Sequence, residues 1–322
     1  MSRSNPSSRA FWALTGLAGG SLAVLVFLLL WQAPQIARGV WLACQDAVSA
    51  VGGYLPALGL LLPLAIVVIA AVRFARSLAL QLWNTRLLVL AMQRRLTARP
   101  AALDDLAGEL GLSDGLHLVD DALAYTFTQG LARPQVWMST GLLALLDMSE
   151  LRAVLVHERH HLHQHDPLRV LISRSLAEAL FFLPLAASLR DIYLAAKEVE
   201  ADQASAADNL LASALLKLLR HGHTLPANAS LAAIGPLDVT RKRIDRLVHQ
   251  SPAFSFADVV RVRHIVVSLA LAAVLMATSY VSTTRAAAPL DGGECGYTTA
   301  PLELQTLASP ADFTPAGIVP LR

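Results

Sequence analysis

The feature that most constrains this chain is an apolar run from Phe11 to Trp31 that contains no charged side chain. At about 1.5 Å of rise per residue, a helix of about 21 residues spans a hydrocarbon core of roughly 30 Å. A signal peptide is the alternative, because Arg3 and Arg9 precede the run. The run is longer than most signal-peptide cores, however, and no clear small-residue cleavage site follows it before Pro34. We therefore predict a transmembrane helix over about 11–31.

Two further apolar segments extend the membrane region. Tyr54 to Val72 predicts a second span, in which Pro56 and Pro63 are tolerated as prolines are in other membrane helices. Ile265 to Val281 predicts a last span. A hydrophobic fraction of 55%, a charged fraction of 16% and a mean hydropathy of +0.50 exclude an ordinary soluble domain. We expect a membrane protein of the mainly α class.

Arginine placement predicts the orientation of these spans, because Lys and Arg are retained on the cytoplasmic side. Arg3 and Arg9 precede the first span, Arg38 alone lies in the loop after it, and six arginines from Arg73 to Arg99 follow the second span. The N-terminus and the long central region are therefore predicted to be cytoplasmic, in an inner membrane of bacterial type.

The predicted organisation has four parts along the chain. They are an N-terminal membrane region over 1–92, a cytoplasmic domain over 93–262, a transmembrane helix within 263–284 and a short extracytoplasmic tail over 285–322. Within the first part, Ser77 to Met92 is apolar but contains Gln81, Asn84 and Arg86. This mixture favours an amphipathic helix over about 77–92 at the membrane surface.

A zinc-binding motif lies in the predicted cytoplasmic domain. His157, Glu158 and His161 spell H-E-x-x-H within Leu151–His165, which follows helix-capping residues and begins with an apolar stripe. Imidazoles at positions i and i+4 lie on one helical face and can bind one zinc ion together, while Glu158 beside the metal can take a proton from zinc-bound water. The alternative is a solvated His-rich helix.

A catalytic zinc site needs a third protein ligand and leaves the fourth position to water. Glu198 is the favoured third ligand, and Asp202, on the same helical face, would orient a ligating imidazole. The alternative role for Asp202 is an ordinary ion pair or helix cap. Glu200 is the rival third ligand and His165 a weaker one.

Leu168–Leu189 is apolar enough to be a transmembrane helix, but a single crossing would be incompatible with this metal site. If the segment crossed the bilayer once, His157 and Glu198 would face opposite sides and could not share a metal ion. We therefore predict a membrane-associated helix over about 168–189; a hairpin broken at Pro184 is the alternative.

Four motifs, in order along about 103–248, resemble the BlaR/MecR-type antirepressor metallopeptidases: Thr126–Leu143, Ser149–Leu168, Glu198–Asp202 and Arg243–Leu247. The resemblance implies a gluzincin-type zinc protease domain in which His157, His161 and Glu198 bind Zn²⁺ and Glu158 is the general base. The related HtpX and CAAX prenyl protease group shares H-E-x-x-H and E-x-x-A-D, and Asp166-Pro167-Leu168 favours the antirepressor branch.

The resemblance also implies a protein substrate, with a transcriptional repressor as one candidate. The short outer tail leaves no room for a penicillin-binding sensor domain, so we expect any stimulus to arrive through the lipid bilayer, the outer segments or a membrane sensor partner. The first alternative is an HtpX-like quality-control protease. The second is a non-catalytic signalling or scaffold protein with a structural metal site, against which Glu158 argues.

The remaining predictions concern substrate binding near the zinc helix. Gly115–Thr128 and Gln135–Ser139 are predicted to be strands of a small β-sheet, with Val136–Ser139 either an exposed edge that pairs with a peptide or a plain strand. His221 and His223 either polarise the scissile carbonyl or, as favoured, mark a solvated helix end. The basic residues within 241–246 favour a membrane-surface role, and we expect no direct nucleic-acid binding.

The two cysteines, Cys44 and Cys295, both lie outside in this topology. The sequence is compatible both with a disulfide between them and with two free thiols.

Overall fold

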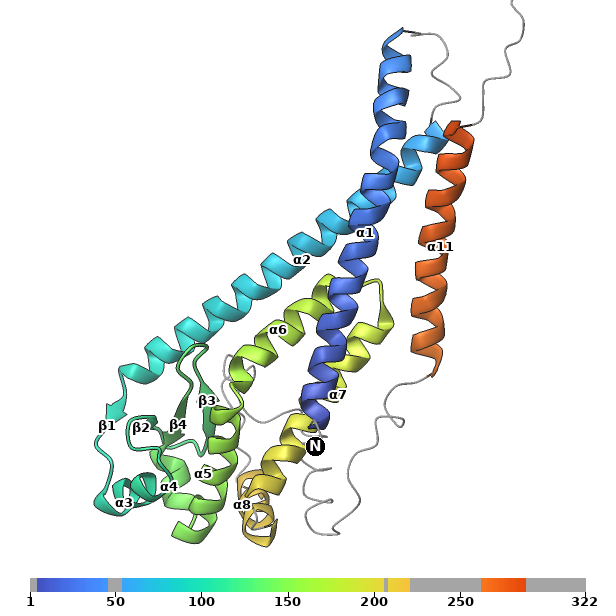
Figure 1. Ribbon diagram of the computed structural model, residues 1–322. Helices are drawn as coiled ribbons and strands as arrows, with labels where there is room; N and C mark the ends of the chain where they lie inside the picture. The colour runs from blue at the N-terminus through green and yellow to red at the C-terminus, as the bar shows by residue number, and fades with distance from the viewer. Residues whose placement is uncertain (1–4, 46–53, 206–207, 221–261, 288–322) are drawn as a thin grey trace, which may run out of the picture. The chain divides into compact units, whose positions relative to one another are not determined.

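The computed structural model describes residues 5–45, 54–205, 208–220 and 262–287 (Figure 1). It is mostly helical, with two long apolar helices and a small mixed sheet, as predicted. The first helix, α1 (Pro6–Gln45), and the second, α2 (Tyr54–Gln93), contain the segments long and apolar enough to cross a membrane, Pro6–Trp31 and Leu62–Gln93. The last helix, α11 (Val262–Ala287), has a shorter described apolar part, Val262–Val274.

The second predicted span and the predicted amphipathic helix are joined in α2. No proline or glycine lies between Val72 and Ser77, and the intervening arginines, phenylalanine and alanine are compatible with a helix. The helix therefore runs without a break from the apolar segment into the segment that carries Arg86.

Helix α2 leads into a sheet of four short strands. These are β1 (Leu96–Thr97), β2 (Leu116–Val119), β3 (Thr126–Gln129) and β4 (Gln135–Ser139), in the spatial order β1-β2-β4-β3. The strands β2 and β4 are parallel, whereas β1 pairs with β2 and β3 pairs with β4 in antiparallel fashion. The predicted strand region 115–128, in which Asp120 and Asp121 are a turn signal, thus contains two strands, β2 and β3.

Of the two alternatives for Val136–Ser139, the exposed edge strand is wrong and the plain sheet strand is the one found. β4 lies between β2 and β3, and β3 is the edge strand next to it. The turn at Gly130 accounts for the pairing of β3 with β4. Gly130 has a φ of +120°, and the nearby Arg133 carbonyl leaves no room for a side chain. The chain therefore returns here as a hairpin. The parallel pairing with β2 is a contact between distant segments that no local pattern reveals.

Each face of the sheet packs against a different part of the chain. Val136 and Met138 join the larger core, to which α3 (Ala101–Glu109), α4 (Thr140–Leu145), α5 (Met148–His163) and α8 (Asp208–Arg220) contribute. The intervening Trp137 faces the opposite side, where Leu88 and Met92 of α2 pack with it. The end of the second long helix is therefore part of the core of the sheet.

The predicted helix over 168–189 is two helices, α6 (Asp166–Ala179) and α7 (Pro184–Ala204). Pro184 occupies the first helical position of α7, where its missing N–H costs nothing. The alternative of a hairpin broken at this proline is therefore the arrangement found. It returns the chain towards α5, so that α7, which carries Glu198, packs against α5, which carries His157.

The two long helices are packed against this hairpin. Phe11 and Leu14 of α1 pack against Ile192 and Tyr193 of α7 in a buried cluster. Along α2, Gln81 donates to Ser175 of α6 at 3.1 Å, and Arg73 and Glu178 form an ion pair at 2.6 Å.

Candidate metal centre

Helix α5, which carries the H-E-x-x-H motif, is anchored at its start by a capping box. The Asp147 side chain accepts from the backbone N–H of Glu150, and the Glu150 side chain accepts from the backbone N–H of Asp147. Ser213 and Lys217 of α8 also donate to Glu150, at 2.7 and 2.6 Å. These contacts anchor the N-terminal end of α5, which is the end farther from the two motif histidines.

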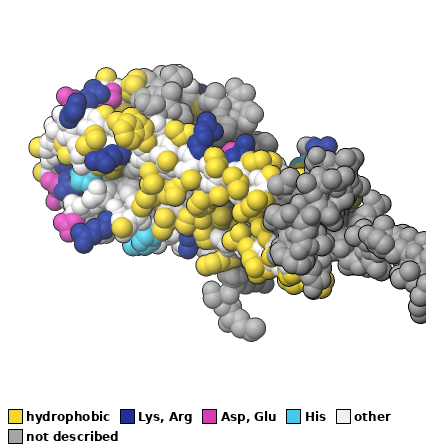
Figure 2. Space-filling model, turned by 90° about the horizontal axis from the view of Figure 1, so that it is seen from above, with side chains coloured by type: hydrophobic (Ala, Val, Ile, Leu, Met, Phe, Trp, Pro, Cys, Tyr) yellow, Lys and Arg dark blue, Asp and Glu magenta, His cyan; other side chains and the backbone are white. Residues whose placement is uncertain are grey.

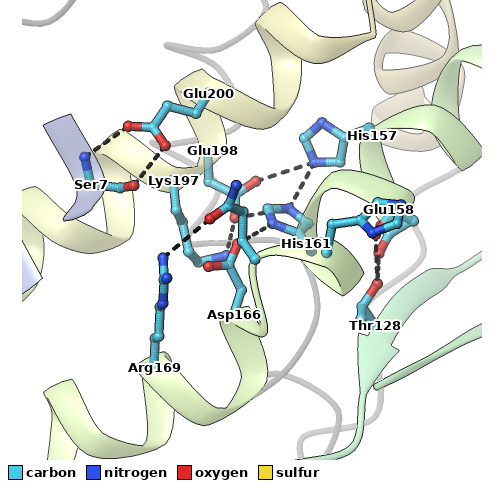
Figure 3. Close-up of polar contacts among 12 residues, drawn as sticks. Ser7, Thr128, His157, Glu158, His161, Asp166, Arg169, Lys197, Glu198 and Glu200 are labelled. Atoms are coloured by element: carbon cyan, nitrogen blue, oxygen red, sulfur yellow. Dashed lines mark hydrogen bonds and ion pairs between the residues drawn. The ribbon is translucent and has the colours of Figure 1, made fainter. Parts of the chain in front are cut away.

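The two motif histidines and Glu198 converge on one point (Figure 3). His157 Nε2 lies 3.1 Å from His161 Nε2 and 3.6 Å from Glu198 Oε2, and His161 Nε2 lies 3.8 Å from Glu198 Oε1. Ligands bound at about 2.0–2.1 Å around a tetrahedral ion are separated by about 3.3 Å. These three buried residues therefore have the spacing and the donor types of a site for one metal ion, consistent with zinc.

A carboxylate lies beside the other nitrogen of each imidazole. Asp202 Oδ1 lies 3.2 Å from His157 Nδ1, as expected from the helical face that Asp202 shares with Glu198. Asp166 Oδ2 lies 2.6 Å from His161 Nδ1. A carboxylate at Nδ1 favours the tautomer whose proton is on that nitrogen, which leaves Nε2 as the electron-pair donor.

Asp166 is a site residue that the chemical analysis of the sequence missed. His165 adopts a left-handed conformation, with φ of 53°, and the tight turn between α5 and α6 brings Asp166 back to His161. Tyr193 donates its hydroxyl to the other carboxylate oxygen at 3.2 Å. Burial alone would raise the pKa of Asp166, but the hydrogen bond and charge of His161 outweigh it and hold that pKa below its ordinary value. The sequence feature that could have identified Asp166 is an aspartate directly before a proline at the start of a helix.

The carboxyl group of Glu158 lies between α5 and the edge strand β3. The Thr128 hydroxyl lies 2.8 Å from Glu158 Oε2 and 3.1 Å from the Glu158 carbonyl oxygen. Both residues are buried. Because Thr128 and Phe127 point to opposite faces of β3, the hydroxyl faces the zinc-motif helix while the phenyl ring packs towards α2.

The rival ligands lie elsewhere. Glu200 accepts hydrogen bonds from Ser7, and His165 is exposed in the turn between α5 and α6. His157, His161 and Glu198 form the one group with metal-ligand spacing found among the described residues.

Some predicted residues lie outside the described parts of the chain. They are His221, His223, the motif Arg243–Leu247, the basic segment 241–246 and Cys295. Cys44 lies in α1, but its side chain is likewise outside the description.

Comparisons with known proteins agree with this geometry. The chain is similar to a protein named Protease HtpX homolog from Ralstonia nicotianae, with 28% identity over 207 residues, covering 46% of this chain and 72% of the relative. A family profile described as BlaR1 peptidase M56 matches residues 43–226, more than half of the chain, and this match includes the whole His-His-Glu group. The resemblance inferred from the motifs is thus confirmed, and the chain belongs to the M56 family of metallopeptidases.

Proposed function

We propose that this protein is an integral-membrane zinc endopeptidase in which His157, His161 and Glu198 hold the metal and Glu158 is the general base. The observation that carries the proposal is the convergence of two Nε2 atoms and one carboxylate, with spacings of 3.1, 3.6 and 3.8 Å. Three protein ligands leave a fourth position, which distinguishes catalytic zinc sites from closed structural ones.

The chemistry divides between the metal and the side chains. Zinc at such a site supplies a Lewis acid that polarises the scissile carbonyl and makes a water molecule acidic. Glu158 takes the proton of the attacking water and passes it to the leaving amine, as a general base and then a general acid. Thr128 holds the Glu158 carboxylate at Oε2, and the carboxylates of Asp166 and Asp202 fix the two imidazoles.

The substrate is a cytoplasmic protein, and a transcriptional repressor is the candidate that membership of the M56 family supports. An HtpX-like quality-control protease is the second candidate, and the similarity to the Ralstonia protein favours it. The two functions differ in their products. A repressor-specific protease produces one cut in one protein, whereas a quality-control protease degrades many damaged membrane proteins.

The membrane arrangement is also a proposal. Two helices are long and apolar enough to span a bilayer, and α2 carries exposed apolar side chains within about 40° of one line along its surface. These side chains are Leu62, Ile69, Val72, Leu80, Trp83, Leu87 and Leu90, whereas the exposed Leu64, Val68 and Leu82 lie outside this line. On the face shown in Figure 2, hydrophobic side chains cover a broad area, and many of the charged ones gather at one end. We infer that this stripe faces lipid and that the metal centre lies at the cytoplasmic surface.

The function is tested by comparing cells that carry the parent protein with cells that carry Glu158→Gln. Peptide mapping of new protein N-termini should find at least one cleavage product that vanishes in the variant, while the purified variant still contains zinc. A variant that retains zinc and leaves every cleavage product and the phenotype unchanged would instead support the third hypothesis, a scaffold protein with a structural metal site.

A further inference from the structure

Lys197 makes a close contact with the carboxylate that completes the metal group. Its Nζ lies 2.5 Å from Glu198 Oε1, and the two side chains are only 15% and 12% exposed. Adjacent residues of a helix point in directions about 100° apart and do not normally face each other. The lysine side chain therefore folds back across α7 to reach its neighbour, and the pair is largely shielded from water and salt.

The contact distinguishes the two oxygens of Glu198. Oε1 accepts from the Lys197 ammonium, whereas Oε2 is the oxygen closer to an imidazole nitrogen, 3.6 Å from His157 Nε2. The distance from Oε1 to His161 Nε2 is 3.8 Å. One oxygen is thus committed to a strong charge-assisted hydrogen bond, and the other is better placed to act as a ligand.

We propose that Lys197 is a positioning residue that makes Glu198 a one-oxygen ligand. A carboxylate that binds through both oxygens fills an additional coordination position, and a catalytic site needs that position for water. By holding Oε1, the ammonium leaves Oε2 to bind the metal and keeps the remaining position open. This inference rests on the proposed function, because it assigns Glu198 as a metal ligand.

Two variants separate the charge of Lys197 from its bulk. Lys197→Met removes the ammonium and keeps an unbranched side chain of similar length, and Lys197→Arg keeps the positive charge. Arg190→Met is the matched control, because Arg190 contacts its own neighbour Asp191 on the same helix, at 2.8 Å, but lies away from the metal group.

The readout is the visible absorption spectrum of the full-length protein loaded with Co²⁺ in detergent, because band intensity reports coordination number and geometry. The parent, Lys197→Arg and Arg190→Met should give the intense bands of four-coordinate cobalt. Lys197→Met should give weaker bands typical of a higher coordination number, and its metal affinity should fall by about 10-fold. Lys197→Gln is measured alongside, so that poor folding of one variant does not decide the result.

A spectrum and a metal affinity of Lys197→Met and Lys197→Gln equal to those of the parent would overturn the inference. This outcome differs from failure of the proposed function, in which the parent itself binds no metal at these residues. Circular dichroism of each variant excludes a simple loss of fold, because a purely structural lysine would change stability without changing the cobalt spectrum.

Discussion

Ser7, in the first turn of α1, donates both its backbone N–H and its hydroxyl to the carboxylate of Glu200, at 2.8 and 2.6 Å. Both residues are buried, and Glu200 lies on the same helix as Glu198. A negative charge at the start of a helix is favourable, because it faces unpaired N–H groups and the positive end of the helix dipole. The first long helix is therefore tied directly to the helix that carries the third member of the metal group.

This tie predicts that Ser7→Ala and Glu200→Gln destabilise the protein without removing a metal ligand. Leaving a buried partner unsatisfied costs about 1–3 kcal/mol. The thermal unfolding midpoint in detergent should fall in both variants, and the neighbouring substitution Ser8→Ala serves as the control. If Ser7→Ala unfolds at the same temperature as the parent, the contact contributes nothing to the packing of α1 on α7.

Asp166 is predicted to control metal affinity through His161. Asp166→Asn removes the charge that orients and polarises the imidazole, so zinc affinity should fall about 10–100-fold. Tyr193→Phe, which removes one hydrogen bond to Asp166, should have a smaller effect in the same direction. Competition with a chelator measures both values, and Asp191→Asn, an exposed position on α7, is the control. Equal zinc affinity in Asp166→Asn and the parent would contradict this role.

The start of α5 should make stability depend on pH in the acid range. Burial tends to raise the pKa of Glu150, but hydrogen bonds from Lys217, Ser213 and the Asp147 N–H outweigh it and hold that pKa below its ordinary value. A lowered pKa in the folded state gives stability that is present above the unfolded-state pKa and is lost as the pH falls through the folded-state pKa.

Glu150→Gln removes this contribution and therefore its pH dependence. Denaturant unfolding at about pH 7 and about pH 3 should show a larger loss of stability in the parent than in the variant. Equal losses would show that the Glu150 carboxylate does not titrate as the capping contacts require.

The exposed stripe of α2 predicts that Trp83 contacts lipid. Trp83 is 62% exposed, and Leu80 and Leu87 lie on the same face of the helix. With Cys44 and Cys295 replaced by Ser, an environment-sensitive fluorophore attached at Trp83→Cys should shift to shorter wavelength when the purified protein is placed in lipid vesicles and should be quenched by brominated lipid. The same label at Asp105→Cys, an exposed position of α3, should show neither effect. A label at position 83 that behaves like the one at 105 would place this stripe in water.

The sequence was sufficient to predict the three residues of the metal group, but not most of the contacts that hold them in place. His157 and His161 could be placed on one face because the helical period is fixed, and Glu198 was preferred because it shares a face with Asp202. These inferences depend on spacings within a single helix. The choice of Glu198 over Glu200 also agrees with the structure, in which Glu200 contacts Ser7 instead.

The features that the sequence did not predict are contacts between segments that are far apart in the chain. The parallel pairing of β2 with β4 makes β4 an internal strand, and no local pattern in 136–139 carries that information. Ser7 and Glu200 are 193 positions apart. The α6–α7 hairpin was an alternative rather than the preferred prediction, because the apolar content of 168–189 masked the effect of Pro184.

The most direct test of the account is an anomalous X-ray difference map, measured at the zinc absorption edge on crystals of the zinc-loaded protein. We predict one peak within about 2.0–2.2 Å of His157 Nε2, His161 Nε2 and Glu198 Oε2, with no fourth protein ligand. A peak bound by other residues, or a fourth protein side chain that closes the coordination sphere, would contradict a catalytic zinc centre at this site.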